Sequence, residues 1–112
     1  MGALSSVSGG SGNIASESFS SISGGHDNQA NGFGSSISGG FRNTASGIDD
    51  SISGGTGNRT LGEMASVSGG SGNTAGSSTS GSGGVGASVS GGANRTAPGN
   101  NNWAAGPLLE SQ

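Results

Sequence analysis

Residues 36–47 read SISGGFRNTASG, and the same pattern returns along most of the chain. In each copy a Val or Ile stands between two Ser residues and Gly-Gly follows. An Asn and an Ala usually come six and eight positions after the Val or Ile. The first five copies are evenly spaced, and a longer interval precedes the sixth copy, which is centred on Val89. A fixed period of this kind is typical of solenoids, in which each repeat forms one coil.

Three columns of the repeat are candidate structural positions. The apolar column contains Val7, Ile22, Ile37, Ile52, Val67 and Val89, and the small-residue column contains Ala15, Ala30, Ala45, Ala75 and Ala97. The Asn column contains Asn13, Asn28, Asn43, Asn58 and Asn73. A β-branched residue between two Ser residues predicts a short strand with one face inward, and the Asn-x-Ala element predicts a second strand. We therefore expect an all-β parallel solenoid of about six 15-residue coils, in which equivalent residues form ladders.

The composition argues against most enzyme classes. Gly, Ser and Asn fill 62 of the 112 positions, whereas Leu, Ile, Val and Phe number only 16. The formal charge is −3 with three scattered Arg residues, so no cationic cluster for nucleic acid is expected. The chain has no Cys and no apolar run long enough for a membrane span. We expect no catalytic, cofactor or metal site, and the open alternatives are a repetitive structure or a disordered linker.

Some local patterns imitate functional motifs. Residues 10–15 and 70–75 match G-x-G-x-x-[GA], but a dinucleotide site requires this pattern between a strand and a helix. The repeat explains these Gly residues without a cofactor. His26 and Asp27 are expected at a solvated turn, because one His without further ligands does not hold a metal.

The small number of large apolar residues predicts association between chains. Six Val or Ile residues make a small core for a chain of this length, and oligomerisation is a common remedy for such a core. We expect a homo-oligomer in which several chains share an apolar axis. Four apolar residues occupy outer or turn positions, where they are candidates for contact with a partner or another subunit: Phe19, Phe33, Phe41 and Ile48.

The period also suggests the domain organisation. Residues 1–99 are expected to form the repeat domain, with residues 76–86 (GSSTSGSGGVG) as an inserted loop and a half-coil insertion as the alternative. Residues 100–112 are expected to form a C-terminal cap or docking tail. This tail contains Trp103, Leu108 and Leu109, which are further candidates for contact.

The repeat resembles the head repeats of trimeric autotransporter adhesins of the YadA type. The residues that carry the resemblance are Ser21, Gly25, Asn28, Ala30 and Gly32 in one copy, and Ser36, Gly40, Asn43, Ala45 and Gly47 in the next. It extends over about residues 5–99. The adhesin repeats usually have a second large apolar residue where this chain has Gly, as at Gly39. The resemblance implies a left-handed β-roll that forms trimers and is displayed outside the cell.

Four functions are compatible with this pattern. The first is a non-enzymatic extracellular or cell-surface adhesion module that binds a host-surface or matrix ligand. The second is a fibre or spike component of a phage tail or contractile injection particle, where a neighbouring fibre subunit would be the partner. The others are a disordered linker and an ice-binding solenoid. Ice binding requires a regular Thr column, whereas the candidate column of this chain contains Ile14, Gln29, Thr44, Arg59, Thr74 and Thr96.

Overall fold

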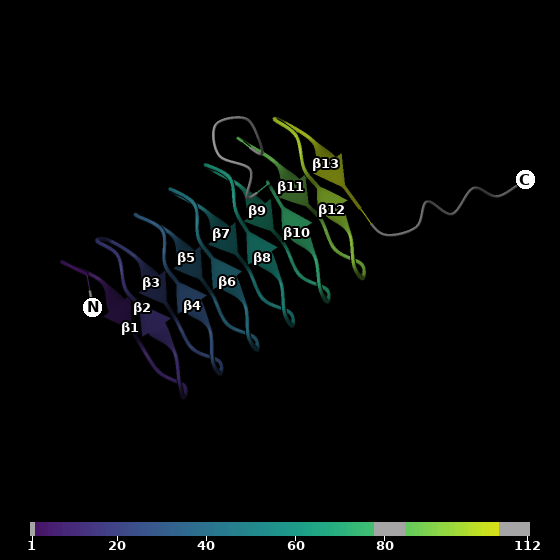
Figure 1. The fold of residues 1–112 in the computed structure, drawn as a ribbon. Coiled ribbons are helices and arrows are strands. Elements are labelled where there is room, and N and C mark those ends of the chain that lie inside the picture. The colour runs from purple at the N-terminus through teal and green to yellow at the C-terminus, as the bar shows by residue number, and fades with distance from the viewer. Residues whose placement is uncertain (1, 78–84, 106–112) are drawn as a thin grey trace, which may run out of the picture.

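The computed structural model describes residues 2–77 and 85–105, and these residues form a β-solenoid (Figure 1). Each coil contributes two short strands, and successive coils stack side by side along one axis (Figure 1). The described part of the chain contains strands and turns and no helix. The expected all-β parallel solenoid of about six coils is therefore confirmed.

The strands belong to two parallel sheets. The seven-stranded sheet contains β1 (Ser6–Val7), β3 (Ser21–Ile22), β5 (Ser36–Ile37), β7 (Ser51–Ile52), β9 (Ser66–Val67), β11 (Ser88–Val89) and β13 (Trp103–Ala104). The six-stranded sheet contains β2 (Ile14–Ala15), β4 (Gln29–Ala30), β6 (Thr44–Ala45), β8 (Arg59–Thr60), β10 (Thr74–Ala75) and β12 (Thr96–Ala97). Each strand pairs with the equivalent strand of the next coil, so that Ile22 lies beside Ile37 and Ala30 beside Ala45.

The Gly-Gly turn that connects the two sheets depends on its second Gly. Gly40 has a φ of 94°, a conformation that residues with a side chain rarely adopt. A Cβ atom at Gly40 would also overlap the carbonyl oxygen of Gly55 in the next coil. Positive φ recurs at the equivalent Gly of every coil, and the overlap with the next coil recurs at Gly10, Gly25, Gly55 and Gly70, which explains why this column is Gly.

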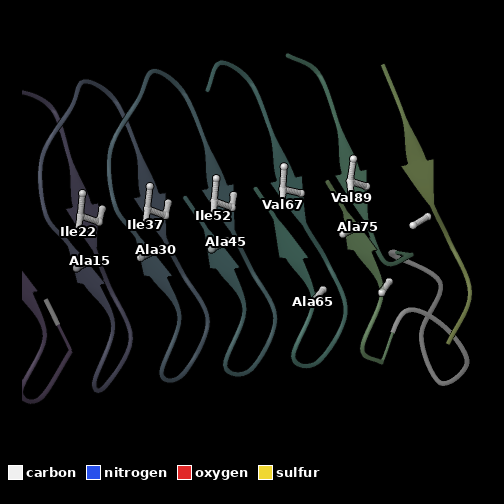
Figure 2. Packing of buried hydrophobic residues seen from close by; sticks show 12 residues of the cluster. Ala15, Ile22, Ala30, Ile37, Ala45, Ile52, Ala65, Val67, Ala75 and Val89 are labelled. Atoms are coloured by element: carbon white, nitrogen blue, oxygen red, sulfur yellow. The ribbon is translucent and has the colours of Figure 1, made fainter. Parts of the chain in front are cut away.

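The core lies between the two sheets of a single chain (Figure 2). Ile22, Ile37, Ile52, Val67 and Val89 form one buried column, and the Ala residues of the six-stranded sheet lie opposite them. Val7 belongs to the same column but is 36% exposed, whereas the other members are buried. It lies in the first coil of the described residues, where no preceding coil covers it. The apolar columns are thus enclosed within one chain, and contact between copies would have to involve outward side chains.

The insertion after β10 preserves the register of both sheets. Val67 pairs with Val89 and Ala75 pairs with Ala97, although the interval between them is longer than one repeat. A half-coil insertion would exchange the inward and outward positions of all later coils. Because the register is preserved, this exchange does not occur. Most of the expected loop 76–86 lies outside the described residues, which stop at Ser77 and resume at Val85.

The solenoid continues past residue 99, into the segment that the sequence predicts to be a C-terminal cap or docking tail. β13 pairs with β11, so that Trp103 occupies the outward Ser position of the repeat and Ala104 occupies the inward Val/Ile position. The consensus does not reveal this strand, because the earlier coils have Ser where Trp103 stands and Val or Ile where Ala104 stands. Leu108 and Leu109 lie outside the described residues.

Candidate functional site

The Asn column forms a hydrogen-bonded ladder that joins the coils. The side-chain Nδ2 of Asn43 donates to the carbonyl oxygens of Gly39 and Gly55, at 3.0 Å each. The Oδ1 atom of Asn43 accepts a hydrogen bond from the backbone N–H of Asn58 at 2.9 Å. Three backbone polar atoms are thereby satisfied by one side chain, so the ladder stabilises the structure and leaves no group free for chemistry.

Asp50 is the one acidic side chain buried in the described core. Its carboxylate accepts hydrogen bonds from the backbone N–H of Gly47 at 2.7 Å and of Ala65 at 2.8 Å. Burial raises the pKa of the Asp50 carboxyl above its ordinary value of 3.8, and these hydrogen bonds act in the opposite direction. The carboxylate is closed off from solvent, so it has no access to a substrate.

Exposed apolar side chains line one edge of the solenoid. This apolar edge consists of Leu4, Phe19, Phe33, Ile48, Met64 and Val85, whose side chains are between 37% and 79% exposed. Hydrogen bonds join the turns of successive coils, since the N–H of Met64 donates to the carbonyl of Ile48 at 2.8 Å. The rings of Phe19 and Phe33 meet edge to face, with centroids 5.3 Å apart. Contiguous exposed apolar side chains of this kind mark contact surfaces.

Several residues of the apolar edge adopt a strained backbone. Leu4, Phe19 and Met64 have φ values of 60°, 62° and 54°. Gly and Asn adopt this left-handed region readily, whereas large apolar residues do so at a cost of about 1–2 kcal/mol each. These side chains are thus unfavourable in two ways in an isolated chain, through strain and through exposure. Strain of this kind is concentrated at functional positions in proteins.

Phe41 lies at the other turn of the coil and does not join the apolar edge. Its ring stacks on His26, with centroids 5.5 Å apart and planes inclined by 15°. The guanidinium of Arg42 lies over the same ring, with its Cζ atom 4.8 Å from the centroid. His26 Nε2 is 3.3 Å from the Asp27 carboxylate. The His26-Asp27 turn is therefore solvated, as expected, but it is also part of an aromatic and charged cluster.

A shallow hollow opens beside this cluster on the outward side of the six-stranded sheet. We call it the polar hollow, and it is lined by Gly12, Ile14, Asp27, Gln29, Arg42 and Thr44. The lining residues come from two positions of the repeat in the first three coils. The sequence pattern does not reveal this hollow, because its members belong to different repeats and only the stacking of coils brings them together.

The motif-like glycines belong to turns of the solenoid. Gly10 and Gly12 precede strand β2 and no helix follows them, so the arrangement that binds a dinucleotide phosphate is not formed there. Within residues 2–77 and 85–105, no three His, Cys, Asp or Glu side chains gather as a metal site would require. In the same ranges no helix is long and apolar enough to cross a membrane.

Comparison of the chain with protein-family models, with curated proteins and with solved structures finds no match. The fold and the two surface features described above, the apolar edge and the polar hollow, are therefore the basis for inferring a function.

Proposed function

We propose that the chain is a non-enzymatic, extracellular attachment module: a homotrimeric rod of left-handed β-roll coils. Its repeat resembles adhesin head repeats, and its coils stack in the linear manner that a rod requires. A trimer presents each surface feature three times, which strengthens binding to a surface with many weak ligands.

The apolar edge is the observation that carries this proposal. Its side chains run along the solenoid axis, so a second copy placed parallel to the first covers the whole edge. A threefold axis along this edge brings three copies together and keeps all of them parallel. Burial of the edge would offset the strain at Leu4, Phe19 and Met64.

The last described coil favours an alternative function, a component of a phage-like fibre or injection spike. Among the described residues β13 is the last strand of its sheet, and Trp103 on this strand is 68% exposed. The indole Nε1 of Trp103 donates to the Ser90 hydroxyl at 2.6 Å, so the ring is held in place while much of its surface remains uncovered. A neighbouring fibre subunit stacked on this end would cover both the strand and the ring.

The proposal is tested by the native mass, measured by light scattering after size-exclusion chromatography. We expect three times the chain mass of 10.4 kDa. The double substitution Phe19→Asn and Met64→Asn is expected to give a folded monomer, because Asn tolerates the left-handed backbone and removes the apolar contact. Ile14→Thr is the matched control, since Ile14 is similarly exposed on the sheet and lies outside the apolar edge. A monomeric wild-type chain would contradict the proposal.

A further inference from the structure

The second and third coils depart from the repeat at one turn. Four coils have small residues there: Ser11-Gly12, Thr56-Gly57, Ser71-Gly72 and Ala93-Asn94. The second coil has His26-Asp27 and the third has Phe41-Arg42 at the same two positions. Because the solenoid forms with small residues at this turn in the other coils, the fold does not require the larger side chains.

Arg42 is held in an unfavourable backbone conformation. Its φ is 56°, and the equivalent residues in other coils are Gly, Asp or Asn, the types that tolerate positive φ best. No structural constraint selects Arg at this position. Strain at an exposed residue that the fold does not need points to a function of its side chain.

The Arg42 guanidinium is oriented but not neutralised. It rests on the Phe41 ring, which is itself supported by the His26 ring. Within the described residues the one ion pair joins His26 and Asp27, so no carboxylate lies within salt-bridge distance of Arg42. Its N–H donors are therefore available at the polar hollow, in a direction fixed by stacking.

The other lining residues define the chemistry of the ligand. Asp27 supplies hydrogen-bond acceptors, Gln29 and Thr44 supply both donors and acceptors, and Ile14 supplies an apolar surface. One cation and one anion line the hollow, so their charges select neither a simple anion nor a simple cation. A ligand that fits must donate and accept several hydrogen bonds and also present C–H groups. A sugar ring has this combination.

We propose that the polar hollow binds one pyranose ring of a neutral glycan. Arg42 and Asp27, which occupy the same turn position in adjacent coils, bind its hydroxyl groups, and Ile14 contacts its apolar face. The proposal deepens the proposed function, because the glycan would be the ligand to which the attachment module binds. A single shallow site gives weak binding, and the repetition of the site in an oligomer compensates for this.

The test is saturation-transfer NMR on the full chain with a panel of methyl pyranosides: glucoside, galactoside, mannoside and N-acetylglucosaminide. We expect at least one to bind with millimolar affinity. Arg42→Gln is expected to weaken binding at least about tenfold, because it removes charged hydrogen bonds. Arg59→Gln is the matched control, since Arg59 is exposed on the same sheet but does not line the hollow. The proposal is overturned if no pyranoside binds, if Arg42→Gln binds as wild type does, or if acetate binds in place of the sugars.

A second variant separates binding from folding. Arg42→Gly reproduces the turn of the first, fourth and fifth coils, so we expect it to leave thermal stability unchanged or raised while binding is lost. Loss of binding together with loss of the folded state in both variants would contradict a binding role. The site and the assembly can fail separately: a trimer that binds no sugar refutes only the site, and a monomer that binds a sugar refutes only the assembly.

Discussion

At the residue scale, the repeat contains two kinds of Gly that look alike in sequence. Gly40, the second Gly of its pair, needs positive φ and has no room for a Cβ atom. Gly39, the first, has ordinary φ and nothing within 4 Å of the place where its Cβ would lie. Both columns are invariant along the chain, yet only the second is explained by the backbone.

This difference predicts effects of very different size for two neighbouring substitutions. Gly40→Ala should destabilise the fold by at least about 2 kcal/mol, because it adds strain and a clash with the Gly55 carbonyl. Gly39→Ala should change the stability by no more than about 0.5 kcal/mol. Thermal unfolding followed by circular dichroism measures both, and equal effects would show that the turn tolerates a side chain at Gly40.

Asp50 gives a prediction for pH dependence. Because the pKa of Asp50 is raised in the folded state, the folded protein binds its proton more tightly than the unfolded chain does. Its contribution to stability is therefore most favourable below the ordinary pKa value of 3.8 and is lost as the pH rises through the folded pKa. Asp50→Ser, which copies Ser20 and Ser35 of earlier coils, should remove this contribution. We expect the stability of wild type relative to the variant to fall between acidic and neutral pH. A constant difference would contradict the raised pKa.

At the element scale, the sequence predicted the strands that repeat and missed those features that do not. Ser-Ile-Ser and Asn-x-Ala recur, so their strands and register could be inferred from the period alone. β13 was missed because Trp103-Ala104 fits the geometry of the position but not the consensus. Phe19, Phe33 and Ile48 were predicted to be contact residues, together with Phe41, which lies at the other turn. The full apolar edge was not predicted, because its members occupy two adjacent positions of the repeat.

The insertion gives a prediction about an element boundary. Deletion of residues 78–84 restores the regular period and joins Ser77 to Val85, which occupy successive positions of the repeat. We expect the solenoid to form with equal or slightly higher stability, because a shorter connection costs less loop-closure entropy. Deletion of residues 57–63 is the control of equal length. It should unfold the protein, because it shifts inward positions outward. Circular dichroism and thermal unfolding distinguish these outcomes, and unfolding of the first variant would contradict the assigned register.

At the scale of the whole molecule, each coil contacts only its neighbours, so stability should change in steps as coils are removed. Deletion of residues 51–65 removes one complete coil and joins Asp50 to Ser66, which occupy consecutive repeat positions. The variant retains the polar hollow and the Phe19–Phe33 contact. We expect it to fold cooperatively with lower stability, and its denaturant m-value should fall by about one sixth because less surface is buried. It should also keep the oligomeric state and sugar binding of the full chain. If removal of this one coil abolishes folding or assembly, the solenoid behaves as a single cooperative domain. That result would refute the proposed modular rod.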